Sequence, residues 1–464
     1  MATIKEKTGF TRGRGSFGRD WTKGSILNNL LSLSWPIIIG SSINMLGPTI
    51  DMIWVGKLGA AAIAGVGVSG MVVMLVDSLK MGLMTGVRAI VARSVGAGDY
   101  EGANHAAQQA FIISAAYSLI VAAIGIFFAE PILILMGMEP DVVSEGAAYM
   151  RIMFVGRMPM SLWMMCEAMM QASGDAVTPM KATIIFRIVH IVLCPFLIFG
   201  WWIFPSMGVS GAAVTNVISQ TMGVALGLWV LLSGNTRLKL TFKRFRFDPG
   251  MIWRIVKIGI PGSVSGIDRT LSQTVLTWLV SPFGTVAVAA HIIIQRVDMI
   301  IFIPSMAIGN AAGVLAGQNL GANEPARAER SGWLGVAVVE GFLILCSVLI
   351  ILWPGFLVKI FNSQPDLVNI ASSFLRIAVA GYLIMSLSSV LMSCINGVGD
   401  TLPAMLISLL VIWLVQVPLA YFLPRITDLG VFGIRWAMVA GTAVNAIIYA
   451  IYFKAGRWKR IKVY

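Results

Sequence analysis

The chain has 464 residues, of which 57% are hydrophobic and 12% are charged, and its formal net charge is +13. A soluble protein has roughly a quarter of its residues charged, so the composition excludes that class and indicates a membrane protein. The positive charge does not indicate nucleic-acid binding, because most of the basic residues lie between apolar runs.

A helix that crosses the hydrocarbon core needs about 20 apolar residues. On this criterion the sequence predicts an all-α membrane protein with twelve transmembrane helices in two six-helix lobes. The N-lobe comprises 30–233 and the C-lobe 254–453, flanked by a basic tail at 1–29, a basic linker at 234–253 and a second basic tail at 454–464. We predict helices at 30–54, 61–87, 104–128, 144–171, 180–203, 209–233, 254–281, 286–316, 331–353, 368–395, 402–423 and 429–453.

Lys and Arg gather on one side of the predicted spans. The two tails and the even-numbered loops hold most of them, whereas the opposite loops hold Lys57, Lys359, Arg425 and Arg435. The positive-inside rule therefore predicts that both termini are cytoplasmic. No cleavable signal peptide is evident. The linker run from Thr236 to Asp248 alternates basic and apolar residues, which suits the surface of anionic membrane lipids.

The two halves of the sequence repeat. Pro36 and Pro261 are 225 residues apart, as are Gly59 and Gly284, and QASGDAVTPM recurs loosely as INGVGDTLPAM. Since six helices is an even number, the two lobes share one orientation and are related by a pseudo-two-fold axis along the membrane normal.

The first predicted helix carries Asp51 near its end. A carboxylate inside a span costs about 2.5–3.5 kcal/mol on insertion scales, so it usually faces the bundle interior or a water-filled cavity. Pro48 cannot donate to the carbonyl of Asn44 and frees that oxygen beside Asp51, while Pro36 adds a second break. We therefore predict an ion-binding helix that bends at its prolines.

Polar residues in the fifth and sixth predicted helices supply partners for Asp51. His190 and Asn216 are expected at the depth of Asp51, although both also suit ordinary interior hydrogen bonds. The predicted ion-coupling residues are Asp51, His190, Asn216, Asn44, Thr215 and Cys194.

The remaining intramembrane charges suit either structural pairing or substrate contact. Asp77 and Lys80 are three residues apart and are predicted to pair, and Glu167 and Arg187 are placed with them near the cytoplasmic ends. In the second half, acids and arginines are expected to compensate one another. The candidate substrate-cavity residues are Met160, Met164, Arg187, Gln220, Asp268, Arg269, Gln273, Gln295, Arg296 and Asp298.

No cofactor or metal site is predicted. The four cysteines are isolated in apolar runs, and His105, His190 and His291 show no metal-ligand spacing. The absence of a nucleophile motif argues against a membrane enzyme, and the repeat favours alternating access over a channel.

Taken in order, the motifs resemble those of the multidrug and toxic compound extrusion (MATE) family. They are WPIIIG followed by IDMIWVGKLG, GAGDYEGA, ASGDAVTPM, AAHIIIQRVD and NGVGDTLPAM, and the similarity spans about residues 30–453. The resemblance implies an antiporter that exports organic, often cationic, compounds in exchange for a cation. The chain most resembles the DinF-like branch of the family. In that branch, Asp51 matches an aspartate of the first helix that is thought to be protonated, and Pro36 matches a proline that is associated with bending of that helix.

The chain departs from that branch at several positions. His190 and Cys194 stand where the branch has an asparagine and an aspartate, and Asn216 stands where it has a threonine. Another branch uses acids that correspond to Arg269 and Ser386 here. Because hard cations need several oxygen ligands, the loss of a carboxylate favours protons as the coupling ion over sodium.

The predicted function is therefore proton-coupled multidrug efflux across the plasma membrane by a monomer, with small organic substrates and membrane lipids as its partners. A sodium-coupled exporter of the same family and a lipid-linked precursor flippase of the same superfamily remain alternatives. The twelve predicted helices argue mildly against the flippase, which would have more.

Overall fold

The computed structural model describes residues 19–234, 236–243 and 245–461, and these residues form helices and turns with no strand among them. Predictions for residues 1–18, 235, 244 and 462–464, in the two tails and the linker, lie outside the described residues. Ten of the described helices are long and apolar enough to cross a membrane.

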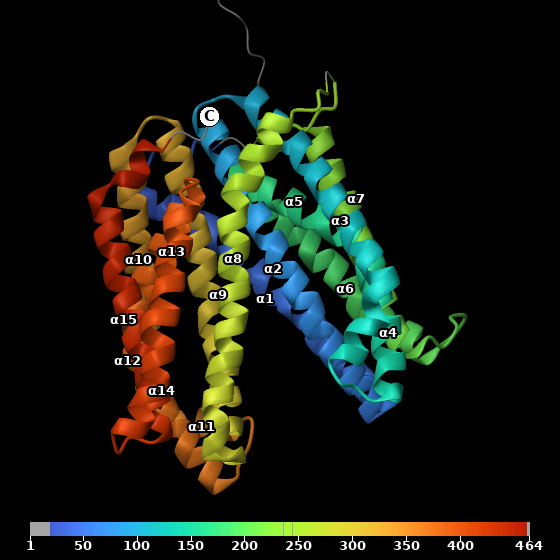
Figure 1. Ribbon diagram of the computed structural model, residues 1–464. Coiled ribbons are helices and arrows are strands. Elements are labelled where there is room, and N and C mark those ends of the chain that lie inside the picture. Colours follow the sequence, from blue (N-terminus) through green and yellow to red (C-terminus); the bar gives the residue numbers. More distant parts are fainter. Residues whose placement is uncertain (1–18, 235, 244, 462–464) are drawn as a thin grey trace, which may run out of the picture.

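The first half of the chain forms the N-lobe, blue to green in Figure 1. Its first helix begins at Ile26, inside the predicted tail, because the hydroxyl of Ser25 caps it by accepting a hydrogen bond from the backbone N–H of Asn28. The N-lobe helices are α1 (Ile26–Val55), α2 (Ala60–Gly96), α3 (Tyr100–Leu135), α4 (Pro140–Val155), α5 (Arg157–Ser173), α6 (Val177–Phe199) and α7 (Gly208–Ser233).

The second half forms the C-lobe, yellow to red in Figure 1. Its first helix begins at Pro249, inside the predicted linker, because Asp248 caps it by accepting from the backbone N–H of Met251 at 3.0 Å. The C-lobe helices are α8 (Pro249–Val280), α9 (Thr285–Gly321), α10 (Pro325–Leu352), α11 (Pro354–Lys359), α12 (Pro365–Gly397), α13 (Thr401–Val411), α14 (Val417–Ile426) and α15 (Val431–Ala455).

The described helices form twelve spanning segments, and three of these differ from an unbroken apolar helix. The predicted fourth helix, 144–171, is divided at Gly156 into α4 and α5. The seventh, α8, is not among the ten apolar spans because it contains Arg254, Lys257, Asp268 and Arg269. The eleventh runs from α13 through a π-helical turn at Ile412–Gln416 into α14.

Helix ends differ from the prediction where caps decide them. α6 stops at Phe199 rather than at 203 because Gly200 adopts a left-handed conformation with φ of 73°. α2 and α9 continue beyond 87 and 316 to Gly96 and Gly321.

The internal repeat is confirmed by element bounds. α2 and α9 each have 37 residues, and they begin and end 225 residues apart. The equivalent turns after α5 and α12 each hold a glycine with positive φ, 96° at Gly174 and 95° at Gly399. Only glycine adopts this conformation without a steric penalty, so the backbone geometry of the turn explains why both halves have a glycine followed by an aspartate there.

Both ends of the described chain lie at one end of the bundle, which we call the terminal end. Arg93, near the end of α2, donates to the carbonyl of Ile461 at 2.7 Å, and Arg327, at the start of α10, donates to the carbonyl of Gly24 at 2.7 Å. The two lobes lie close together there and diverge toward the opposite end, which we call the far end (Figure 1).

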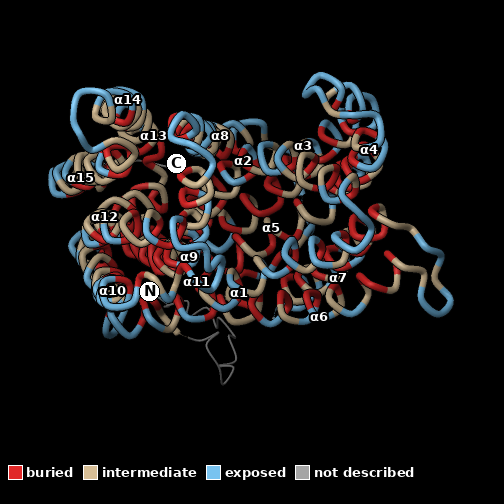
Figure 2. Tube along the Cα trace, turned by 90° about the horizontal axis from the view of Figure 1, so that it is seen from below, coloured by how far each residue is buried: buried red, intermediate tan, exposed pale blue. Residues whose placement is uncertain are grey.

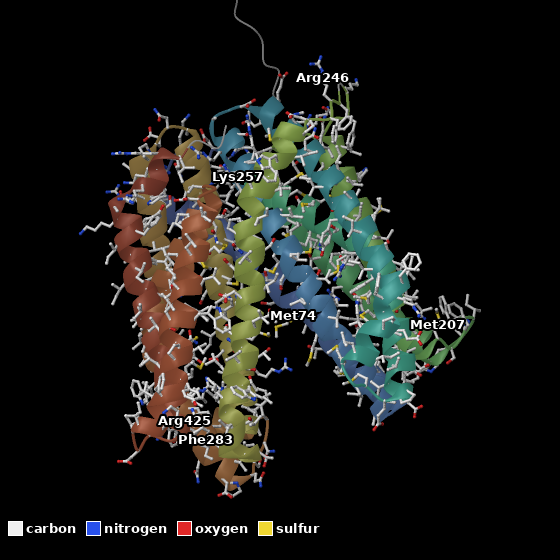
Figure 3. All side chains as sticks on the ribbon, in the orientation of Figure 1. Met74, Met207, Arg246, Lys257, Phe283 and Arg425 are labelled. Carbon is white, nitrogen blue, oxygen red and sulfur yellow. The ribbon has the colours of Figure 1, made fainter. Side chains whose placement is uncertain are left out.

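The predicted linker packs on α3 rather than only lying along a membrane surface. Leu238 and Leu240 are buried, and Nε2 of His105 lies 3.0 Å from a carboxylate oxygen of Asp248. The hydrogen bond with His105 lowers the pKa of the Asp248 carboxyl. Exposed phenylalanines and basic residues of the linker still point outward, among them Arg246 in Figure 3.

Candidate ion-coupling and substrate sites

Asp51 lies one turn from the end of α1 and is buried, with 2% of its surface exposed. Pro48 and Pro36 both lie inside the helix, so the carbonyls of Asn44 and Ser32 lack their usual helical donors. The helix is continuous nonetheless, which leaves bending at these prolines as a prediction.

Three side chains from α6 and α7 bind the Asp51 carboxylate. Nε2 of His190 is 2.7 Å and Sγ of Cys194 is 3.4 Å from Oδ1, and Nδ2 of Asn216 donates to Oδ2 at 2.9 Å. His190 and Cys194 are one turn apart on α6 and therefore reach the same oxygen. Four of the six residues predicted for ion coupling thus contact one another directly, and a fifth, Asn44, joins them through Arg187.

Arg187 joins the same network through His190. Its Nη1 lies 2.9 Å from Nδ1 of His190, and its Nη2 donates to Oδ1 of Asn44 at 2.5 Å. A guanidinium has only donors, so Nδ1 of His190 accepts and its Nε2 carries the hydrogen. His190 therefore donates from Nε2 to Oδ1 of Asp51. Gly47 leaves room for the guanidinium, since a Cβ at this position would overlap it.

The cluster of Asp51, His190 and Cys194 also has the atoms of a metal site, within 4.8 Å of one another. A metal-binding histidine normally donates its second ring N–H to an acceptor. In this protein that nitrogen accepts from Arg187, and the nitrogen facing Asp51 carries a hydrogen, so the arrangement does not fit a metal ion. A hard cation such as sodium would also compete with three donors for a single carboxylate.

The other predicted N-lobe residues lie apart from this network. The hydroxyl of Thr215 donates to the carbonyl of Gly211 at 2.7 Å. Met160 accepts from Arg157 at 2.9 Å, Gln220 is buried in α7 and Met164 is half-buried in α5. Arg187 lies in the middle of α6, against His190 and Asn44, rather than near a helix end.

Structural ion pairs account for the charges at the break between α4 and α5. Arg157 is buried and lies 3.0 Å from Asp77, while the predicted partner Lys80 lies 3.7 Å from the same carboxylate. Arg157 also donates to the carbonyl of Val73 at 3.2 Å. The break at Gly156 therefore coincides with a contact that links α5 to α2.

In the C-lobe the predicted compensation of charges is found for Asp298, which pairs with Arg435, but not for Arg269 and Arg296. Asp268 accepts from Trp413 at 2.6 Å, and Asp298 binds the hydroxyl of Tyr382 and lies 3.8 Å from Arg435. Arg269 and Arg296, expected to pair with these acids, are both exposed.

The other polar candidates of the C-lobe also have partners. Gln295 donates to Gln273 at 3.0 Å, and Glu340 accepts from Ser386 at 2.5 Å.

Arg435 was predicted to lie in a loop but belongs to α15. Arg435 is buried in α15, where it donates to the carbonyl of His291 at 3.3 Å and lies over the ring of Phe374. Its place inside an apolar run of the twelfth helix was the available signal.

Comparison with known proteins agrees with the repeat. The MatE family profile matches the chain twice, over residues 36–196 and 261–422, which together make up most of its length. The chain belongs to the MatE family. Because the family consists of transporters, the chain is a multi-pass membrane transporter rather than an enzyme in the usual sense.

Curated MatE relatives match along almost their whole length. The chain is 26% identical to the probable multidrug resistance protein YoeA of Bacillus subtilis, covering 95% of this chain and 96% of YoeA. It is 28% identical to the probable multidrug resistance protein NorM of Agrobacterium fabrum, covering 90% and 91%.

Solved MATE structures share the fold at lower identity. A MATE protein in a bent conformation superposes with a TM-score of 0.88 at 22% identity, covering 94% of this chain and 96% of the other. An outward-facing multidrug resistance MATE transporter superposes with a TM-score of 0.86 at 22% identity, covering 94% and 98%.

Proposed function

We propose that this MATE transporter exports organic compounds in exchange for protons, with Asp51 as the group that takes up the proton. Family membership and the names of its relatives as multidrug resistance proteins support export of foreign compounds. The buried carboxylate of Asp51, bound by side chains of two other helices, supports the assignment of the coupling site.

The donors around Asp51 favour a proton over sodium. The Asp51 side chain accepts from His190, Cys194 and Asn216, and the positive charge of Arg187 lies next to it through His190. A proton requires one lone pair, whereas sodium requires a shell of oxygens that these donors do not provide. Sodium coupling remains the second candidate, for which the free carbonyl of Asn44 would be an oxygen ligand.

Proton uptake would rearrange the network. A protonated Asp51 gains an O–H that needs an acceptor, and Arg187 loses its balancing negative charge. The nearby acceptor without a helical donor is the carbonyl of Asn44, opposite Pro48. Reorientation of Asp51 toward this carbonyl would pull on α1 at its proline breaks and so couple protonation to movement of the lobe.

The distribution of basic residues supports a cytoplasmic location of the terminal end. On that assignment the lobes in this structure are in contact on the cytoplasmic side and diverge on the external side (Figure 1). A membrane potential contributes about 2.3 kcal/mol per charge per 100 mV. One proton therefore supports roughly a fiftyfold concentration ratio of a neutral substrate.

The test is export from proteoliposomes energised by a pH gradient or by a sodium gradient. We compare the parent with Asp51→Asn and with the control Asp366→Asn, an exposed acid at the start of α12. Export by the parent and the control under a pH gradient, and its loss in Asp51→Asn, supports the proposal. Export driven only by sodium, or full proton-driven export by Asp51→Asn, contradicts it. Movement of lipid-linked substrates alone would support the flippase.

A further inference from the structure

The two lobes touch along one face of α2 and one face of α8 near the terminal end. A Cβ at Gly82 or Gly86 of α2 would overlap backbone atoms of Gly259 or Ile255 in α8, and the hydroxyl of Ser263 donates to the carbonyl of Leu79 at 2.6 Å. Such close approach is possible because small residues occupy the contact.

The same helical faces are exposed toward the far end. Met71 lies seven residues before Ser78, which contacts Gly266 of α8, yet Met71 is 68% exposed and Met74 is 57% exposed. Gln273, seven residues after Gly266 on α8, is exposed too. Residues seven apart share a helix face, so α2 and α8 separate there. Figure 3 shows Met74 between the lobes.

We call these separated surfaces the inner faces. The N-lobe inner face carries Met71, Met74 and Leu75, which are apolar and exposed. The C-lobe inner face carries Arg269, Gln273 and Arg296, all exposed.

Arg269 lies over α9 rather than toward lipid. Its guanidinium is 4.1 Å from the ring centroid of Phe302, and Nη1 is 4.0 Å from the sulfur of Met306. Among the described residues no acid forms an ion pair with it, because the neighbouring Asp268 turns inward to Trp413. Its charge therefore remains uncompensated and accessible.

Arg296 projects from α9, a helix that has neighbours in both lobes. α9 contacts α8, α10 and α12 of its own lobe and α1 and α2 of the other, and Figure 2 shows it between α12 and α1. Asp298 faces α12, and Arg296, two residues earlier, lies about 200° around the helix. Arg296 therefore faces the N-lobe, and no described acid forms an ion pair with it.

The two arginines are close in depth. Phe302 of α9 lies at the level of Arg269, because the guanidinium of Arg269 packs on its ring. Arg296 is six residues from Phe302 on the same helix, which corresponds to about 9 Å along the helix axis. The exposed charges of the C-lobe inner face are thus two guanidiniums at neighbouring levels, while Asp268 is buried and Asp298 binds Tyr382 and lies 3.8 Å from Arg435.

We propose that the substrates of this transporter are amphipathic organic anions. Arg269 and Arg296 bind the anionic group, and the methionines of α2 contact the apolar part. Guanidinium groups pair well with carboxylate, sulfonate and phosphate, and exposed thioethers adapt to varied apolar shapes. The proposal rests on the transport function above and replaces the cationic substrates expected from the family resemblance.

The charge preference follows from this arrangement. An anion relieves the repulsion between two unpaired arginines and forms charge-assisted hydrogen bonds with them, whereas a cation would enter against both charges. We expect each arginine to contribute about tenfold to the affinity for an anion, since bonds to charged groups contribute about 1.5 kcal/mol or more.

The test is equilibrium dialysis of the purified full-length protein with pyrenesulfonate and with pyrenylmethylammonium, which share an apolar body and differ in charge. The variants are Arg269→Gln/Arg296→Gln and the charge-preserving Arg269→Lys/Arg296→Lys. The control is Arg246→Gln, an exposed linker arginine at the terminal end (Figure 3).

We expect the parent and the control to bind the sulfonate more tightly than the ammonium. The glutamine variant loses roughly a hundredfold, and the lysine variant retains most of the affinity. Tighter binding of the ammonium by the parent, or no loss in a folded glutamine variant, overturns the proposal. Proton-driven transport is measured separately. A parent that binds the sulfonate through these arginines but exports nothing supports the anion site and contradicts the coupling mechanism.

Discussion

Replacement of Arg187 by methionine is expected to free Nδ1 of His190. In the parent, the alternative tautomer would lose the bond from Arg187 and the bond to Asp51, at 2.9 Å and 2.7 Å. Two bonds to charged groups are worth about 3–6 kcal/mol. Less than about 1% of the parent should therefore have the hydrogen on Nδ1. In Arg187→Met, Nδ1 has neither its donor nor the neighbouring positive charge, and it becomes able to take a proton.

The measurement is ¹⁵N NMR of histidine-labelled protein, which is tractable because the chain has three histidines. His190→Asn assigns the signal, and Arg151→Met, which removes an exposed arginine, is the matched control. The parent and control should show a bare Nδ1 and a protonated Nε2 at neutral pH, and Arg187→Met should show a proton on Nδ1. A parent His190 with hydrogen on Nδ1 would refute the inferred network.

Two further predictions concern the lobes and the linker. Gly82→Val should push α2 away from Gly259 and Ser263 and so lower the fraction of molecules whose lobes are in contact at the terminal end. Distances between spin labels on the two lobes at that end measure this fraction, and unchanged distances would contradict the packing argument. Asp248→Asn removes a carboxylate whose pKa is lowered by the hydrogen bond with His105. The contribution of this carboxylate to the free energy of unfolding is present above about pH 4, and it is lost as the pH falls through the lowered pKa. The thermal midpoints of parent and variant should differ at pH 5–7 and converge below pH 4, and a gap that persists at low pH would exclude this cause.

Local sequence signals predicted the helices and the repeat because apolar runs and glycine turns act over short distances. The break at Gly156 was not predictable in the same way. The apolar run continues through Phe154, and the reason to interrupt it, the buried contact of Arg157 with Asp77, comes from another helix. Helix ends at Gly96 and Gly321 were likewise placed by packing between lobes.

The candidate site was predicted in part for a similar reason. Asp51, His190 and Asn216 are isolated polar residues in apolar helices, so their spacing was informative. Arg187 and Arg435 have long side chains, and the position of their Cα atoms does not reveal where the guanidinium lies. Their partners depend on which helices are neighbours, which a single sequence does not specify.

The glycine contact between α2 and α8 has a consequence for turnover. Because Gly82, Gly86 and Gly259 carry no side chain, separation of the lobes exposes less apolar surface at these positions than larger residues there would expose. These positions therefore add little to the free-energy difference between the two arrangements of the lobes. When two conformations of a transporter differ by only a few kcal/mol in free energy, ligands of modest affinity can shift the equilibrium in both directions. Large apolar side chains at these positions would instead stabilise the conformation with lobes in contact and stop the transport cycle.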